Sequence, residues 1–362
     1  MQFKENIPLS QIENELNQLW KSRSQANTKA SLFNLIIYTH EPRRTAYFQD
    51  IARLVMSQFP CRIIFIQGDQ NAQNAYLHAK ISIGDENLTT PACDLIFFEA
   101  AGSFLANIPN LILPYFLPDL PIYLLWGQDP TTENTILPSL QKFAKRLIFD
   151  SESCEDLQCF SQTMLKRLES SPIDIIDMNW ARIKGWQEVL AHAFDSHERI
   201  QQLSSSQTIT ITYNNRPSDL FLHPDTQTIY LQAWLATQLN WQFKGLKKHE
   251  HTLVLSYQSP SLANSLLTLN LVGQRRDNLQ AEEIFNFEAT DPGNFLYTLN
   301  RTGESQVIVH CHTIDRCEIP LTLSLPNLCS GRSFIQEIFY QKPSQQYWQM
   351  LNLVSQIAWG VS

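Results

Sequence analysis

The chain has 362 residues, of which 43% are hydrophobic and 11% aromatic, with a formal net charge of −8. This apolar content is enough for two domain cores at about 100–200 residues per domain, and it excludes an intrinsically disordered chain. Nucleic acid is not an expected partner, because neutralising phosphates requires an excess of basic residues. With only 11 glycines, a glycine-rich phosphate-binding loop is not expected either.

Neither apolar candidate for a membrane segment has the expected pattern. The first twenty residues predict an amphipathic helix and not a secretory signal, so we expect a cytoplasmic protein. Residues 104–126 are long enough to span a bilayer, but they contain four prolines and a charged residue, which would leave backbone groups unsatisfied in lipid. We therefore interpret this stretch as buried core and expect no membrane partner.

After an N-terminal helix and linker (residues 1–30), residues 31–175 predict a mainly parallel, Rossmann-like α/β domain. Short β-branched and aromatic runs alternate with helical patterns, and near-continuous apolar runs are typical of strands buried on both faces. The expected strands are 32–39, 61–67, 121–127 and 146–151, with 75–84 and 93–98 less clearly defined.

Residues 203–362 predict a second domain of the α+β class, with an antiparallel sheet and helices on one face. Consecutive strand patterns follow one another without intervening helices. The expected strands are 208–213, 252–257, 266–272, 284–289, 295–300, 307–312 and 318–324, and the expected helices are 224–241, 333–340 and 345–357.

Residues 176–202 predict a helix between the two domains. Its apolar positions form two stripes, one with Trp180 and the other with Trp186, as in a helix sandwiched between layers. We expect Asp177, Asn179 and Arg182 to belong to the same joint.

A possible anion site follows the first strand. His40, Arg43 and Arg44 lie at the start of a predicted helix, where α/β folds often bind anions. The alternative is a solvated first helical turn, since the close backbone approach that glycine permits is missing.

Histidine and cysteine pairs are candidates for metal and redox chemistry. His249 with His251 and His310 with His312 are spaced to share one side of a strand and could hold a metal, although cross-strand packing or surface exposure is the more common reason for such a pair. A hairpin symmetric about Ile314 would place Cys311 opposite Cys317, at a spacing suited to a disulfide. Cys154 and Cys159 are the poorer pair, because their i, i+5 spacing does not align them on a helix. Reduced thiols are the default for a cytoplasmic chain.

The common motifs of dinucleotide, triphosphate, acyl-transfer and zinc-hydrolase sites do not occur in the sequence. We therefore expect no catalytic residue, no bound metal and no cofactor.

Six segments stand out in order along the chain: residues 33–37 (FNLII), 59–64 (FPCRII), 113–126 (LPYFLPDLPIYLLW), 147–151, 177–182 (DMNWAR) with Trp186, and 233–236 (AWLA) with Trp241. Together they resemble the OpcA family of glucose-6-phosphate dehydrogenase assembly proteins. The residues that carry the resemblance include Pro118, Asp119, Trp126, Asp177, Asn179, Trp180, Arg182, Trp186, Trp234 and Trp241. The resemblance implies a non-catalytic protein that promotes the active, oligomeric form of glucose-6-phosphate dehydrogenase and, in photosynthetic bacteria, links it to thiol redox state.

Three functional hypotheses follow. The first is an effector that binds and activates glucose-6-phosphate dehydrogenase. The second is a sugar-phosphate- or nucleotide-binding protein, or an enzyme, that uses a crevice formed by His40, Arg43, Arg44, Trp126, Asp129 and Ser151. The third is a structural protein that forms its own homo-oligomer. A large exposed apolar patch would favour the first or the third hypothesis.

Overall fold

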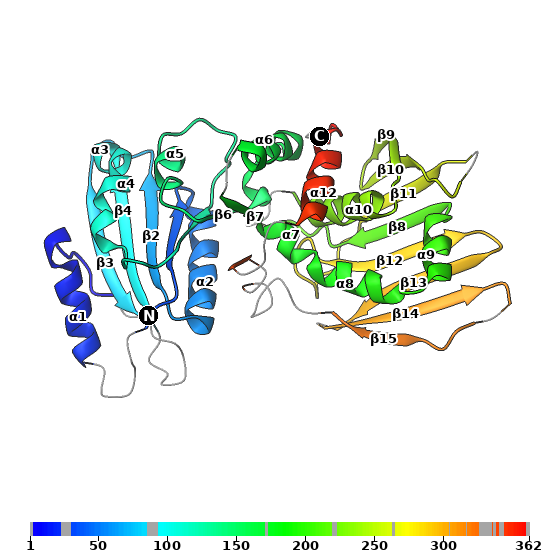
Figure 1. Ribbon diagram of the computed structural model, residues 1–362, viewed down its shortest axis with the longest axis horizontal. Coiled ribbons are helices and arrows are strands. Elements are labelled where there is room, and N and C mark those ends of the chain that lie inside the picture. The colour runs from blue at the N-terminus through cyan, green and yellow to red at the C-terminus, as the bar shows by residue number, and fades with distance from the viewer. Residues whose placement is uncertain are drawn as a thin grey trace. The chain divides into compact units, whose positions relative to one another are not determined.

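The computed structural model describes residues 3–22, 30–84, 93–170, 173–218, 223–262, 265–303, 305–315, 317–325, 335, 338–339 and 344–359. The chain forms two compact units, each built around its own sheet (Figure 1). Unit 1 comprises Met1–Cys154 and Leu168–Asp177, and unit 2 comprises Glu155–Arg167 and Met178–Ser362. Residues 178–202, most of the expected connecting segment, belong to unit 2 in this division.

The sheet of unit 1 has seven strands in the order β3-β4-β2-β1-β5-β6-β7. All neighbouring strands are parallel except β3 and β4. The strands are β1 (Asn34–Thr39), β2 (Arg62–Asp69), β3 (Leu77–Ile83), β4 (Asp94–Ala101), β5 (Ile122–Trp126), β6 (Arg146–Phe149) and β7 (Asp174–Asp177). The expected mainly parallel α/β unit is thus confirmed.

Buried strands and amphipathic helices explain this layering. Every residue of β1 is buried, as expected for a strand covered on both faces. Helix α2 (Pro42–Gln58) starts with proline, which is tolerated in a first helical turn, and buries an apolar stripe that includes Phe48 and Val55. The other helices of unit 1 are α1 (Ile12–Ser22), α3 (Gly102–Ala106), α4 (Ile108–Leu111) and α5 (Ile136–Leu140). Most of α6 (Leu157–Ser170) is assigned to unit 2 and its last three residues to unit 1.

The sheet of unit 2 has eight strands in the order β15-β14-β13-β12-β8-β11-β10-β9. It is antiparallel apart from the parallel pair β8 and β11. The strands are β8 (Thr208–Tyr213), β9 (Gln242–His249), β10 (Thr252–Gln258), β11 (Leu267–Gly273), β12 (Ile284–Asp291), β13 (Phe295–Thr302), β14 (Gln306–Thr313) and β15 (Leu321–Ser324).

The helices of unit 2 are α7 (Met178–Arg182), α8 (Lys184–Ala193), α9 (His197–Ser204), α10 (Thr226–Gln238) and α12 (Gln345–Ser355). Helix α10 is central, because it packs against α7, α12 and strand β8, and residues 226–236 are all buried. The expected α+β unit is confirmed.

Across the part of the chain that the structure describes, no helix combines the length and the apolar character needed to cross a membrane.

The differences from the expected elements have local causes. Strand β9 was not expected, because its sequence QFKGLKKH is polar. Lysines are common on the edge strands of sheets, where they prevent the strand from pairing with another chain. Strand β15 begins at Leu321, later than expected, since Pro320 has no N–H to donate to the ladder. The expected helix at 333–340 lies largely outside the described residues.

Candidate functional site

The strand order of the unit 1 sheet reverses at β1. From β1 the chain runs outward on one side through β2 and β4 and on the other through β5, β6 and β7. Ligands of parallel sheets commonly bind at such a point, because the loops leaving the two central strands diverge there. His40 follows β1 and Gly127 follows β5 at this point of the sheet.

The three candidate anion-binding residues do not converge on one pocket. Arg44 is buried, and its Nη2 donates to Asp150 Oδ2 at 2.5 Å and to Ser153 Oγ at 3.0 Å. Arg43 is exposed. His40 is half-buried, and burial lowers its pKa while nearby Glu41 opposes that shift. Because Arg44 is already neutralised by a buried carboxylate, it has little charge to offer an anion.

The other residues expected at the crevice also have structural contacts. Trp126 stacks on Tyr38 with ring centroids 4.3 Å apart. The Asp129 carboxylate accepts hydrogen bonds from Thr131, and the Ser151 N–H donates to Asp177 Oδ1 at 3.1 Å. Gly127 is needed for packing, since a Cβ there would lie within 3 Å of the Phe48 ring. The absence of a side chain at Gly127 therefore leaves room for the Phe48 ring of α2.

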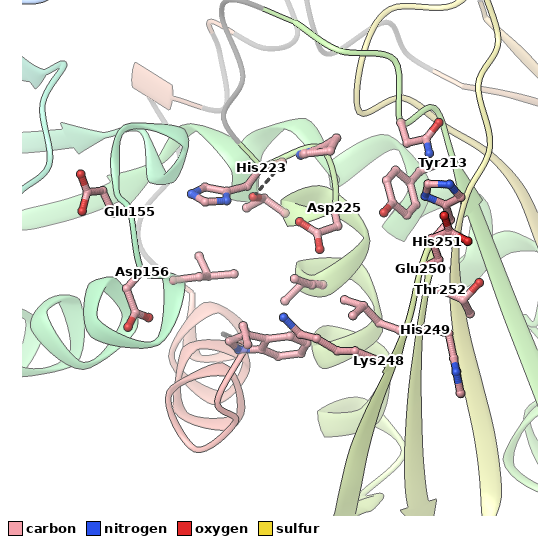
Figure 2. Close-up of a pocket in the computed structure, with 17 residues that line it drawn as sticks. Glu155, Asp156, Tyr213, His223, Asp225, Lys248, His249, Glu250, His251 and Thr252 are labelled. Carbon is pink, nitrogen blue, oxygen red and sulfur yellow. Dashed lines mark hydrogen bonds between the residues drawn. The ribbon is translucent and has the colours of Figure 1, made fainter. Parts of the chain in front are cut away.

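A second concave site lies within unit 2, where the start of α10 meets the turn between β9 and β10 (Figure 2). It is a cavity of about 730 Å³. Its polar lining comes from the residues before α6 and α10, the end of β8 and the β9–β10 turn, and its labelled members are Glu155, Asp156, Tyr213, His223, Asp225, Lys248, His249, Glu250, His251 and Thr252.

The centre of this cavity is a group of mixed charge. Figure 2 shows His223 and Asp225 at the start of α10, with Lys248 extending toward them from the end of β9. Burial raises the pKa of the Asp225 carboxyl, while His223 and Lys248 act in the opposite direction. Burial and the nearby Asp225 carboxylate both raise the pKa of Tyr213. A cavity of this size, with a lysine and a histidine beside a carboxylate, suits a small polar molecule.

Sequence reasoning did not find this cavity. Asp225 and Lys248 come from two elements 23 positions apart, and β9 was not expected as a strand. The only sequence signal nearby was the His249/His251 pair. The structure places these two histidines on either side of the turn residue Glu250, so the expectation that they share one strand is wrong.

The second histidine pair has the expected arrangement. His310 and His312 lie on β14 with parallel rings whose centroids are 6.5 Å apart. Among the residues whose placement is described, no group of three or more potential ligands could hold a metal ion.

The structure does not place Cys311 opposite Cys317. Cys317 forms an antiparallel β-bridge with His312 instead. Cys311 therefore lies one residue away from the position opposite Cys317. Successive residues of a strand face opposite sides, and Cys311 is accordingly buried while Cys317 is exposed. Cys154 is buried and Cys159 is exposed, and none of these four cysteines forms a disulfide with another described residue.

A thiol pair that was not expected lies in unit 1. The sulfur atoms of Cys61 and Cys93 are 3.8 Å apart, and both residues are buried. They precede the neighbouring strands β2 and β4, a relationship that depends on strand order and leaves no mark in the sequence.

The residues that carry the family resemblance make structural contacts. The Trp180 ring lies 5.4 Å from that of Tyr347, and the Trp186 indole N–H donates to the Ile284 carbonyl at 3.2 Å, both within unit 2. Arg182 donates to Asn179 Oδ1 at 2.6 Å. Trp234 and Trp241 are buried in unit 2 as well, whereas Pro118 and Asp119 are exposed in unit 1. That residues 176–202 form a joint between the two units remains a prediction.

Two family models match successive parts of the chain. The model for the N-terminal domain of a glucose-6-phosphate dehydrogenase subunit, OpcA_G6PD_assem, matches residues 52–166. The model for the C-terminal domain of the same subunit, OpcA_G6PD_C, matches residues 173–309.

Curated relatives carry the name OxPP cycle protein OpcA. The protein from Nostoc punctiforme is 27% identical over 237 residues, which is 64% of this chain and 47% of the relative. The protein from Synechocystis sp. is 30% identical over 196 residues, or 53% of this chain and 39% of the relative. The chain thus spans less than half the length of these relatives.

Solved structures share the fold at low identity. An oxidoreductase from Erwinia carotovora atroseptica has a TM-score of 0.51 at 8% identity, covering 89% of this chain and 96% of that one. A super-repressor mutant of Gal80p from Saccharomyces cerevisiae has a TM-score of 0.51 at 9% identity, covering 90% and 95%. These likenesses establish the fold alone.

Proposed function

This chain belongs to the OpcA family, and from that premise we propose that it is a non-catalytic effector that binds and activates glucose-6-phosphate dehydrogenase in the oxidative pentose phosphate pathway. The observation that carries the proposal is the match, in order, of both domain models of a glucose-6-phosphate dehydrogenase subunit. We place the protein in the cytoplasm with this partner.

The contacts where the strand order of unit 1 reverses argue against a ligand site at His40, Arg43 and Arg44. A nucleotide or sugar phosphate would need cations and a close backbone approach at this point. Here Arg44 is held by Asp150, and Gly127 accommodates the ring of Phe48. The alternative of ligand binding at His40, Arg43 and Arg44 therefore has less support than protein binding.

Activation by binding has a definite thermodynamic requirement. An effector shifts its partner toward the active state only by binding that state more tightly than the inactive one. A tenfold shift of the equilibrium needs about 1.4 kcal/mol of differential binding free energy. The effect should therefore saturate with effector concentration.

Complex formation with the purified cognate dehydrogenase tests the binding step. On a sizing column we expect the two proteins to elute together, earlier than either alone. The protein by itself should not reduce NADP in the presence of glucose 6-phosphate. Separate elution at every concentration ratio would contradict the proposal, and turnover by the protein alone would contradict its non-catalytic character.

A further inference from the structure

The sheet of unit 2 has one face turned away from its helices. Along β8, Ile209 and Ile211 are buried, whereas the alternating Thr208 and Thr210 are half-exposed. The same alternation continues in β10 to β14, and α10 packs against β8 and β11. Because alternate residues of a strand face opposite sides, the half-exposed positions share the face opposite α10.

The strand pairings align these half-exposed residues in rows across the sheet. The central row is Val254, Asn270, Thr210, Glu288, Thr298 and His310, one from each of β10, β11, β8, β12, β13 and β14. The row on either side contains no Asp, Glu, Lys or Arg on these six strands. On these six strands Glu288 is therefore the only one of these positions that carries a full charge at neutral pH. On the edge strand β9, Lys247 pairs with Val254 and adds a positive charge at the rim of the same face.

Such a face is unusual for a surface in contact with water. Solvent-exposed protein surfaces carry about 25–35% charged residues, whereas the centres of protein interfaces are depleted of charge. Seven of these eighteen positions are threonine and two are valine, and both residue types pack well against a second pleated surface. The composition thus indicates a surface that is covered by protein.

The size of the face fits a stable association. At a strand spacing of about 4.8 Å, eight strands span roughly 34 Å, and six residues along each strand add about 20 Å. The projected area is roughly 700 Å², close to the approximately 800 Å² that each partner buries in a standard interface.

From this geometry we infer that the open face of the unit 2 sheet binds a second copy of this chain, sheet against sheet. A broad pleated face fits best against another such sheet, at about 10 Å separation, and a second copy supplies a matching one. A two-fold axis parallel to the strands, over the boundary between β8 and β12, brings Glu288 of each copy opposite Thr210 of the other. The carboxylate then faces a hydroxyl that can donate to it, and the two Glu288 side chains do not oppose one another.

The test is the mass of the purified full chain in solution, measured by sedimentation or by light scattering. The monomer has a mass of 41.8 kDa, and a dimer of about twice that mass is expected at roughly 50 µM, since interfaces of this size bind at micromolar affinity or better. Thr210→Arg and Thr298→Arg place a charge at the centre of the face, where the long side chain can reach solvent in the monomer. Each should weaken dimerisation at least tenfold.

Gln201→Arg is the matched control, because Gln201 is exposed on α9 and the substitution adds the same charge. It should leave the dimer intact. Circular dichroism and melting curves establish that each variant is folded. If either Thr210→Arg or Thr298→Arg does not fold, the other variant is used for the test. A wild type that stays monomeric, or a dimer that neither face variant weakens, overturns the inference. If the wild type is monomeric and Thr210→Arg instead abolishes binding to the dehydrogenase, the face belongs to that enzyme and self-association is wrong.

Discussion

Arg44 Nη2 and Asp150 Oδ2 lie 2.5 Å apart in the interior of unit 1, with both side chains almost completely buried. This ion pair joins the first turn of α2 to the residue that follows β6. Arg44, which the sequence suggested as an anion-binding residue, therefore has a structural role.

We therefore expect Arg44→Ala to destabilise the protein by about 3–5 kcal/mol, because it leaves the Asp150 carboxylate buried without its partner. Denaturant unfolding measures this loss. The exposed neighbour Arg43 is the control, and Arg43→Ala should change the free energy of unfolding by less than about 0.5 kcal/mol. The structural account of Arg44 is wrong if Arg44→Ala keeps wild-type stability and instead abolishes micromolar binding of glucose 6-phosphate measured by calorimetry.

Trp180 should contribute mainly to stability. It is 6% exposed and packs against Tyr347 of α12. Trp180→Ala should cost about 3–5 kcal/mol, as expected for removing a buried aromatic side chain. Trp348→Ala is a matched control, because Trp348 lies beside Tyr347 in the same helix but is only partly buried and should cost less. A Trp180→Ala protein that melts like the wild type but no longer activates the dehydrogenase would assign this segment to partner binding.

Tyr38 should make the protein sensitive to alkaline pH. Burial raises its pKa to about 12, whereas the pKa of an unfolded tyrosine is about 10. Above pH 10 the unfolded chain releases the phenolic proton and the folded chain retains it, so stability is full below pH 10 and is lost as the pH rises toward 12. The free energy of unfolding, measured by denaturation between pH 9 and pH 12, should fall less steeply for Tyr38→Phe than for the wild type. The two slopes should differ by up to about 1.4 kcal/mol per pH unit. Identical pH profiles for the two proteins would show that Tyr38 does not titrate in this way.

Thiol reactivity should follow burial. Cys159 and Cys317 are exposed, whereas Cys61, Cys93, Cys154 and Cys311 are buried. Burial also raises the pKa of the Cys61 and Cys154 thiols, which lowers the thiolate fraction that reacts.

In a Cys329→Ser background, which removes the cysteine outside the described residues, Ellman's reagent should modify Cys159 and Cys317 rapidly in the native protein. The buried thiols should react only after unfolding, and Cys159→Ser with Cys317→Ser should abolish the fast phase. Fast modification of Cys311, or a Cys311–Cys317 disulfide formed in the native protein, would contradict the observed register.

The sequence was sufficient to predict the strands and helices in which buried residues are continuous or recur periodically. Strand β1 and helix α10 could be predicted because apolar residues occupy nearly all of their positions. Polar β9 could not be, since its place at the sheet edge comes from pairing with β10. A one-residue shift in the turn after β14 was enough to separate Cys311 from Cys317, and local spacing does not fix such a shift.

The candidate sites depended more strongly on long-range contacts. Arg44 could be placed at a crevice from its position after the first strand, but its partner Asp150 lies 106 residues away. Asp225 and Lys248 line the same cavity, although they belong to elements that are separate in the sequence. Physical rules about sequence spacing identify faces of elements, and the tertiary fold decides which faces meet.

The most direct test of the proposed function is the rate of the purified cognate glucose-6-phosphate dehydrogenase as this protein is added. We expect the rate to rise to a plateau and the glucose 6-phosphate saturation curve to change, with no product formed when the dehydrogenase is omitted. If neither reduced nor oxidised protein changes the rate at any concentration, and no complex elutes from a sizing column, the assignment as a dehydrogenase effector is wrong.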